Sequence, residues 1–302
     1  MRIAHLSDLH LLDLEGAVPY RLFNKRLTGY ANLRLKRGHR HKPEPVTLAA
    51  RRMVALKIDH LVVTGDVSNL ALEREFDLVK ALFEDEVGLS PDQISIVPGN
   101  HDVYTSGSVR AGRFAQWFSR YMTTDLEGIA TDSGFPFVRL RGPVAIIGLS
   151  TAVSRPPLVA SGQLGKAQIV ALERALKHPE VKARTPIILQ HHPIHNPASF
   201  AKSALEGLWD AQGELKALRE VARGLLLHGH WHRRVRTPQP TERGSIEVVG
   251  ATSASLLHED HNKMAGFNVY EIASDGALGD MTTFRFDQRA QGFDEVPLPR
   301  TA

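Results

Sequence analysis

Five short apolar runs in this chain each end directly in a polar motif that contains His, Asp or Asn. The runs are rich in β-branched and other apolar residues and span Ile3–Leu6, Leu61–Thr64, Ile94–Val97, Ile187–Gln190 and Leu225–His228. Segments with helical apolar spacing lie between them, at 46–57, 72–86, 109–122, 168–176 and 213–223. This alternation is typical of parallel βαβ units, because parallel neighbours need a crossover connection. We therefore expect an α/β fold.

The second half of the chain predicts further strands. Residues 137–141 and 144–149 are expected to form a hairpin around Gly142-Pro143, and strands are expected at 245–250, 267–272 and 281–286. The length of 302 residues is enough to bury a large core. We expect one domain over 1–302, with a basic insertion at about 14–43 and an irregular tail after 287.

The polar motifs predict a shared site. Ligands of α/β sheets gather outside the carboxyl ends of the strands, which is where all five motifs fall. Each motif alone is more typical of a surface turn than of a functional site. Five of them in this position are hard to explain by packing. The motifs are Ser7-Asp8-Leu9-His10, Gly65-Asp66, Gly99-Asn100-His101-Asp102, His191-His192-Pro193 and Gly229-His230-Trp231-His232.

The residue types point to metal binding. The chain has no cysteine, which excludes disulfides, thiolate catalysis and Cys-ligated zinc, but it has fifteen histidines. Side chains at i and i+2 on extended backbone share a face, so Asp8 with His10, and His230 with His232, can each grip one ion. Imidazole and oxygen ligands without thiolate suit Mn, Fe, Zn or Ni better than Ca.

Charge is unevenly distributed along the chain. Residues 17–43 carry eight basic and no acidic side chains, so the net charge of +4 leaves −4 for the remainder. Within this segment Phe23, Leu27 and Tyr30 form an apolar stripe at helical spacing. Three interpretations stay open: a solvated surface helix, contact of residues 20–42 with an anionic membrane surface, or attraction of nucleic acid or another anion. Without a long apolar run or a signal-peptide pattern, we expect a cytoplasmic protein, with peripheral contact at the inner membrane face as the alternative.

The ordered set Asp-x-His, Gly-Asp, Gly-Asn-His-Asp, His and Gly-His-x-His resembles the calcineurin-like metallophosphoesterase superfamily. The resemblance runs from Asp8 to His232. It implies a four-layer αββα sandwich of two mixed β-sheets flanked by helices. It also implies a dinuclear site that holds two divalent or trivalent metal ions, such as Mn, Fe, Zn or a mixture.

The same resemblance implies roles for individual residues. One metal ion would be held by Asp8, His10, Asp66 and His232, and the other by Asp66, Asn100, His191 and His230, with Asp66 bridging. His191 is chosen over His192 because the family pattern places the ligand two residues before the proline. Asp66 and His101 would be catalytic, with His101 as the acid or phosphate contact. Asn100 and His101 would contact the substrate. His195 is a further candidate contact for a different reason, because it falls in a loop that could reach the mouth of the site and loops often carry function.

The resemblance also suggests a substrate class. The motifs look most like the class III cyclic-nucleotide phosphodiesterases, which implies a small phosphodiester substrate such as cAMP or cGMP. The first alternative is a peripheral-membrane UDP-diacylglucosamine-type pyrophosphate hydrolase. The basic segment favours it, and His101, where such enzymes commonly carry Arg, counts against it. A nuclease and a non-catalytic scaffold are further alternatives, and the intact ligand set disfavours the scaffold. No obligate protein partner is expected, and the oligomeric state stays open.

Overall fold

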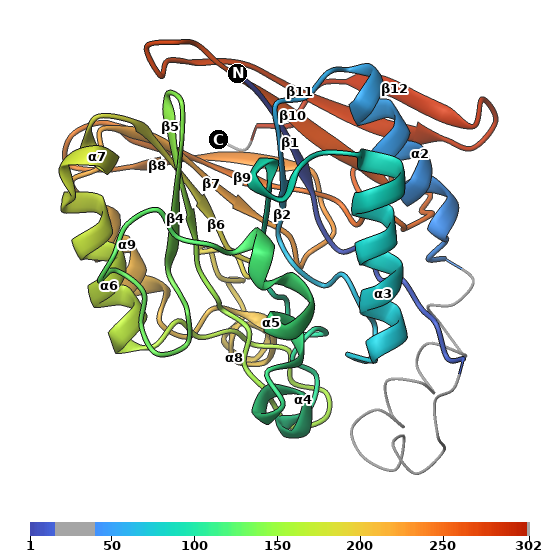
Figure 1. Ribbon diagram of the computed structural model, residues 1–302, viewed down its shortest axis with the longest axis horizontal. Helices are drawn as coiled ribbons and strands as arrows, with labels where there is room; N and C mark the ends of the chain where they lie inside the picture. The colour runs from blue at the N-terminus through green and yellow to red at the C-terminus, as the bar shows by residue number, and fades with distance from the viewer. Residues whose placement is uncertain (16–39, 301–302) are drawn as a thin grey trace.

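Two β-sheets packed face to face form the centre of the molecule in this computed structural model, which describes residues 1–15 and 40–300 (Figure 1). Within those residues each sheet has six strands. The first has the order β12-β11-β10-β1-β2-β3, with bounds Arg2–Leu6 (β1), His60–Val63 (β2), Ile94–Ile96 (β3), Gly266–Ile272 (β10), Leu278–Asp287 (β11) and Gly292–Val296 (β12). The second has the order β4-β5-β6-β7-β9-β8, with bounds Phe137–Arg141 (β4), Val144–Gly148 (β5), Thr185–Leu189 (β6), Arg223–His228 (β7), Val235–Pro240 (β8) and Ser245–Gly250 (β9).

Helices cover the outer face of each sheet (Figure 1). The first sheet is covered by α2 (Pro43–Ala55), α3 (Glu73–Ala81), the π-helical turn Leu82–Val87 and α5 (Arg113–Phe118). The second is covered by α6 (Lys166–Lys177), α7 (Pro179–Lys182) and α9 (Ala211–Leu218). Shorter helices are α4 (Ser106–Arg110), α8 (Phe200–Glu206) and 3₁₀ turns at Pro91–Gln93 and Ser119–Tyr121.

Three apolar layers hold these four layers of secondary structure together. One lies between the sheets and includes Ile3, Ile187 and Leu225. The other two lie between each sheet and its helices, and α6 contributes to one of them through residues spaced three or four apart, as an amphipathic helix does. Because the central strands are buried on both faces, they read as continuous apolar runs in the sequence. The expected αββα sandwich of two mixed sheets is confirmed.

Some local expectations were wrong. The chain after Asp287 is not irregular, because Gly292–Val296 pairs with β11. The expected helix 109–122 is divided into α4 and α5, since Gly112 adopts a left-handed φ of 56° between them. The edge strand β8 was not expected because it contains two prolines, which edge strands tolerate. The apolar stripe of the basic insertion lies outside the described residues.

Candidate metal centre

The five strand-end motifs meet at one edge of the two sheets. The backbone amide of Asp8 donates to the carbonyl of Gly65 at 2.9 Å, which joins the motifs after β1 and β2. The amide of Gly229 donates to the carbonyl of His191 at 3.1 Å, which joins the motifs after β6 and β7. The amide of His230 donates to Asp8 Oδ2 at 3.1 Å and links the two pairs across the sheets. Motifs far apart in sequence therefore form one connected site.

The backbone of these motifs is left-handed rather than extended. The φ angles are 52° at Asp8, 47° at His10, 50° at Asp66, 68° at His230 and 49° at His232. The expectation that i and i+2 side chains pair on extended backbone was therefore wrong in its geometry. Asp8 and His10 do converge, whereas His232 lies with that pair and His230 lies beside His191. A non-glycine residue with left-handed φ and ψ angles costs about 1–3 kcal/mol of stability, and such residues cluster at functional sites.

The first group of candidate ligands is Asp8, His10 and His232. Asp8 Oδ1 lies 3.0 Å from His232 Nε2 and 3.9 Å from His10 Nε2. The two imidazole Nε2 atoms are 3.3 Å apart. Asp8 and His10 are buried. A carboxylate oxygen and two ring nitrogens that converge in a buried site provide the donor set of a transition-metal ion.

The second group of candidate ligands is centred on Asp66. Its Oδ2 lies 3.3 Å from His191 Nε2, and Asp8 belongs to the same cluster of ligand atoms within 4.8 Å of one another. Asp66 also forms such a cluster with His10, so its carboxylate faces both groups, as a bridging ligand must. The rings of His230 and His191 have centroids 5.2 Å apart. The buried Oδ1 of Asn100 has no hydrogen-bond partner within the described chain.

The hydrogen bonds of two histidines show that these residues fit a cation. His191 Nδ1 lies 2.7 Å from the carbonyl of Thr64, which can only accept, so Nδ1 carries the proton. Its buried Nε2 makes no hydrogen bond to any described residue and faces the Asp66 carboxylate. His230 Nε2 donates to the carbonyl of Glu206 at 2.9 Å and leaves a lone pair on Nδ1. This second hydrogen bond is how proteins orient metal-binding histidines.

Burial and neighbouring charges set the protonation of the site. Burial, together with nearby imidazoles, holds the pKa of His10 and of His230 well below the usual value, so both rings are neutral, the form that binds metal. Burial favours the neutral acid of Asp66, but His191 and His101 outweigh it and hold its pKa well below the usual value. Burial also disfavours charge on His191, but the Asp66 carboxylate raises its pKa to about 9. A proton and a metal ion therefore compete for the space between Asp66 and His191.

Glycines and one carboxylate support the ligand loops. A Cβ atom at Gly99 would lie 2.2 Å from Asp66 Oδ1, and one at Gly229 would lie 2.2 Å from Asp8 Oδ2, so only glycine allows this approach. Asp102 accepts the backbone amides of Gly99 at 2.9 Å and Ser68 at 3.0 Å. Asp102 therefore braces the loop that carries Asn100 and His101.

Three further histidines of the predicted site differ in their distance from the ligand clusters. His101 is half-buried, its Nδ1 lies 2.7 Å from the carbonyl of Asn69, and it clusters with His10 and Asp66 within 4.8 Å. His192 uses both ring nitrogens on protein groups, a hydroxyl and a carbonyl, each at 2.8 Å, which favours its neighbour His191 as the ligand. The structure does not bring His195 into these ligand clusters, and its Nε2 lies 2.9 Å from a side-chain oxygen in β8.

Sequence reasoning missed His41 and Ser253. His41 forms a cluster of ligand atoms with His10 and His232 within 4.8 Å, and its ring centroid lies 4.8 Å from that of His10. Its Nδ1 lies 2.8 Å from Ser255 Oγ. Ser253 donates to the carbonyl of Asp8 at 2.6 Å. Ser253 lies in a polar run directly after β9, so the strand-end pattern could have identified it. His41 does not follow a strand, so the same pattern could not identify it.

Comparison with known proteins identifies the family. The family model described as calcineurin-like phosphoesterase matches residues 1–234. The chain belongs to this family. A search among curated proteins finds no match.

Solved structures share the fold at low sequence identity. A dimetal phosphatase from Danio rerio is similar with a TM-score of 0.58 and 13% identity over 100% of this chain and 99% of that one. A purple acid phosphatase from yellow lupin (Lupinus luteus) seeds has a TM-score of 0.55 and 13% identity over 96% of this chain and 55% of that one. A sulfate thiohydrolase from Thermus thermophilus has a TM-score of 0.50 and 16% identity over 97% of this chain and 58% of that one.

Family membership and the converging ligand groups together make the protein a metal-dependent phosphoester hydrolase. The family uses a dinuclear centre, and the ligand atoms around Asp66 fit it. Along the described residues, no helix is long and apolar enough to span a membrane.

Proposed function

We propose that the protein hydrolyses small phosphodiesters, with 3′,5′-cyclic nucleotides as the first candidates. The observation that carries this proposal is the position of His101, a half-buried imidazole at the edge of the metal centre. Hydrolysis of an alkyl phosphodiester releases an alkoxide, which needs a proton more than the phenolate released from an activated aryl ester does. A histidine beside the reacting phosphate supplies that proton.

The environment of His101 suits this role. Its Nδ1 lies 2.7 Å from the carbonyl of Asn69, and the ring stacks on Tyr104 with centroids 5.3 Å apart. Both contacts fix the orientation of the ring beside His10 and Asp66. Bound metal ions would supply the charge that stabilises the transition state and lowers the pKa of water. Asp8, Asp66, Asn100 and the ligand histidines would hold those ions, and His101 would hold the proton for the leaving oxygen.

A cavity beside His41 offers space for the rest of a substrate. It has a volume of about 410 Å³ and is lined by Arg40, His258, His261 and Met264 among others. The backbone bridge between His41 and Leu256 places it next to the first group of ligands. Small-molecule sites typically have volumes of about 300–1,000 Å³. Its charged side chains are one basic and one acidic residue, Arg40 and Glu259, so the cavity supplies polar contacts and space for the rest of a substrate beside the metal centre.

A substrate panel tests the proposal. The full-length protein is loaded with Mn²⁺ or Zn²⁺ and assayed with bis(p-nitrophenyl) phosphate, p-nitrophenyl phosphate, cAMP, cGMP and UDP-diacylglucosamine. Asp66→Asn serves as the variant without a bridging carboxylate. We expect diesters to be hydrolysed faster than the monoester, and His101→Ala to lose about 10²–10⁴-fold on cAMP while losing less on the activated p-nitrophenyl ester. Faster monoester hydrolysis, or full cAMP turnover by His101→Ala, contradicts the proposal.

One observation favours lipid-linked pyrophosphates as a second candidate substrate. The side chains of Leu158, Phe200 and Trp209 are 90%, 88% and 54% exposed. They come from two segments joined by backbone hydrogen bonds next to Glu206, whose carbonyl accepts from His230, and the Arg155 guanidinium lies 3.5 Å over the Trp209 ring. Exposed apolar side chains therefore lie near the metal centre. Exposed apolar patches mark membrane or protein contacts. Residues 20–42, most of which lie outside the described chain, are a further proposed point of membrane contact.

Vesicle co-sedimentation separates the two candidates. Leu158→Ser/Phe200→Ser should lose binding to vesicles of phosphatidylglycerol and phosphatidylcholine if the apolar surface touches lipid. The matched control Val54→Ser/Val170→Ser changes side chains that are 51% and 52% exposed on other parts of the molecule. If both variants sediment equally and UDP-diacylglucosamine is not hydrolysed, the cyclic-nucleotide proposal is the only candidate that remains.

A further inference from the structure

A second cavity lies at the opposite end of the second sheet from the metal centre. It has a volume of about 530 Å³ and is lined by the last turns of α6 and α9, by α7, and by residues at the beginnings of β6 and β7. The candidate ligands follow the carboxyl ends of these same strands. The length of β7 from Arg223 to His228 separates the two sites by about 17 Å, at about 3.3 Å per residue. The cavity is therefore not part of the metal centre.

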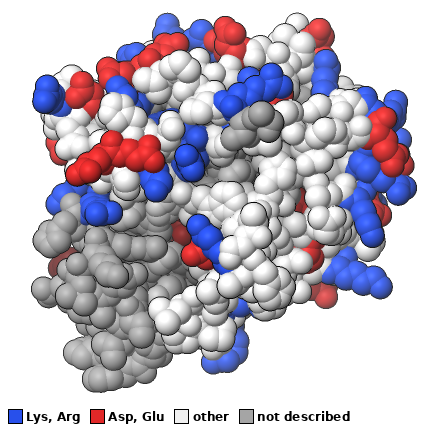
Figure 2. Space-filling view, turned by 180° about the vertical axis from the view of Figure 1, so that it is seen from behind, with Lys and Arg blue, Asp and Glu red and all other residues white. Residues whose placement is uncertain are grey.

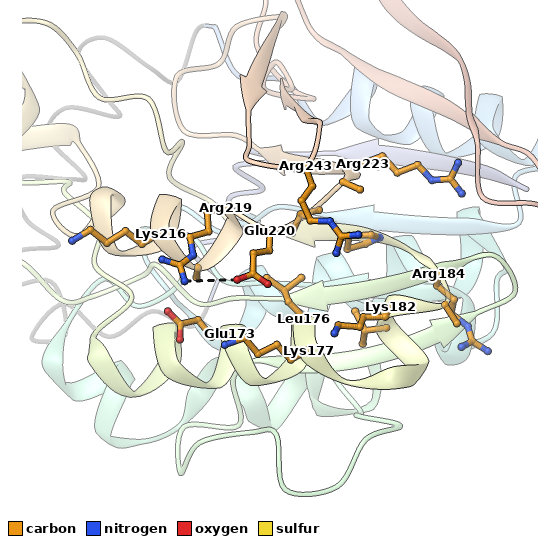
Figure 3. Close-up of a pocket in the computed structure, with 16 residues that line it drawn as sticks. Glu173, Leu176, Lys177, Lys182, Arg184, Lys216, Arg219, Glu220, Arg223 and Arg243 are labelled. Carbon is orange, nitrogen blue, oxygen red and sulfur yellow. Dashed lines mark ion pairs between the residues drawn. The ribbon is translucent and has the colours of Figure 1, made fainter.

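The charges of the cavity are strongly one-sided. Seven basic and two acidic residues line it, which gives a net charge of +5 (Figure 3); they are Lys177, Lys182, Arg184, Lys216, Arg219, Arg223 and Arg243, with Glu173 and Glu220. Outside residues 17–43 the chain as a whole carries −4, so this concentration does not follow from composition. On the face in Figure 2 basic and acidic side chains are interspersed instead.

The ion pairs of the lining leave most of this charge uncompensated. Glu220 pairs with its neighbour Arg219 at 3.7 Å, as the dashed line in Figure 3 marks. Arg184 pairs at 2.7 Å with Glu180, which lies outside the lining. The described structure contains no ion pair for five of the lining cations, which are Lys177, Lys182, Lys216, Arg223 and Arg243.

Helix ends explain only part of this arrangement. Basic residues stabilise the negative end of a helix, which accounts for Lys177, Lys182 and Lys216 in the last turns of α6, α7 and α9. It does not account for Arg243, which comes from the turn between β8 and β9. Arg223, at the start of β7, donates to the carbonyl of Asp275 at 2.7 Å. Cations from separate segments that face one opening repel each other, and a bound anion relieves that repulsion.

The floor of the cavity is apolar. Val181 and Val221 are 2% and 9% exposed, and Leu176 and Ala217 pack beside them against the core under the second sheet. Figure 3 shows Leu176 close to Lys182 and Arg243 at the same opening. A bare inorganic anion would leave this floor in contact with water. A ligand with both a charged and an apolar part covers it.

We propose that this cavity binds a phosphorylated organic molecule of nucleotide size, independently of the metal centre. The phosphates lie against Lys182 and Arg243, and the organic part lies on the floor formed by Leu176 and Val181. Arginine suits this role because its planar guanidinium binds phosphate with two hydrogen bonds and can also stack on a planar ring.

Equilibrium dialysis of the full-length protein with the non-hydrolysable probe α,β-methylene-ADP tests this site. Measurements before and after treatment with a chelator separate it from the metal centre, since binding in the basic cavity does not need metal. We expect saturable binding of one equivalent that survives the chelator. Adenosine and pyrophosphate should each bind at least tenfold more weakly, because each has only half of the required chemistry.

Matched variants locate the binding. Lys182→Ala/Arg243→Ala should weaken the chelator-resistant binding at least tenfold, whereas Lys166→Ala/Arg289→Ala, with the same change of net charge elsewhere, should leave it unchanged. Ala222→Trp should block the opening without changing charge. Absence of chelator-resistant binding, or equal loss in both double variants, overturns the proposal. Pyrophosphate bound as tightly as the probe also overturns it, because the site would then recognise charge alone. None of these outcomes depends on the substrate of the metal centre.

Discussion

Replacing Gly229 by alanine should disable the metal centre with little change to the rest of the fold. A Cβ atom at this position would lie 1.9 Å from Ser7 Oγ and 2.2 Å from Asp8 Oδ2. Gly229 is not among the residues with positive φ, so the effect of alanine is purely steric. Ordinary van der Waals contacts are about 3.5 Å, so the Asp8 carboxylate must retreat by about 1 Å.

That displacement acts on a ligand with few alternative positions. Asp8 Oδ2 accepts hydrogen bonds from Ser7 Oγ at 2.5 Å and from the His230 amide at 3.1 Å, and its Oδ1 lies 3.0 Å from His232 Nε2. Misplacement of a catalytic group by about 1 Å costs on the order of 100-fold in rate. Overpacking should lower the free energy of unfolding by about 1–3 kcal/mol. We therefore expect kcat/KM to fall about 100-fold and the metal content per chain to drop.

The assay combines elemental analysis of bound metal, turnover of bis(p-nitrophenyl) phosphate and thermal unfolding. Gly107→Ala is the matched control, because the nearest atom to its added Cβ would be Thr105 Oγ1 at 3.7 Å and it lies in α4. This control should keep full activity, since alanine also favours the helix. A Gly229→Ala protein with two bound metal ions and turnover within about twofold of the wild type would refute the steric reasoning.

Three further predictions follow from the same structure. His60 is buried, and burial, reinforced by Arg139 and Arg141, lowers its pKa to about 3. The unfolded state therefore takes up one more proton between pH 6.5 and that pKa, so stability present above pH 6.5 is lost as pH falls. Between pH 6.5 and 5 the wild type should lose about 2 kcal/mol more free energy of unfolding than His60→Gln, measured by urea unfolding at both pH values. If the two proteins lose the same amount, protonation of His60 is not the cause. His41→Ala should weaken metal binding about tenfold in a chelator competition, and an unchanged midpoint would show that His41 does not support the metal. Removal of metal should lower the Tm by several degrees and Mn²⁺ or Zn²⁺ should restore it, whereas a chelator-insensitive Tm would mean that the native state is not stabilised by metal.

The ligand motifs could be predicted from sequence because their information is local. A buried parallel strand reads as an apolar run, and the polar residues that follow must lie at the edge of the sheet. Asp8, Asp66 and His191 each stand within two residues of such a run. His41 has no such marker. It approaches His10 only because its backbone pairs with Leu256 through an isolated bridge, a contact set by tertiary structure.

The two edge strands that sequence reasoning missed share a physical cause. β8 carries Pro238 and Pro240, and the exposed positions of β12 include Asp294 and Glu295. Prolines and charges protect sheet edges from pairing with other molecules. The same residues interrupt the apolar alternation by which strands are predicted, so these two strands were not expected. The basic cavity could not be foreseen either, because its cations come from five separate segments that only the packing of α6, α7 and α9 brings together.

The strained backbone of the motifs explains why these ligands need a rigid fold. Five candidate ligands are non-glycine residues with positive φ, and at about 1–3 kcal/mol each their combined cost is comparable to the net stability of about 5–15 kcal/mol that a domain retains. The strain persists because the loops are tied on both sides. Asp8, for example, donates its amide to Gly65 and accepts Ser253 at its carbonyl. In return, the left-handed turns bring Asp8 and His10 together, with Asp8 Oδ1 3.9 Å from His10 Nε2. The sandwich of sheets thus holds ligand atoms that would repel one another, and a bound cation converts that repulsion into attraction.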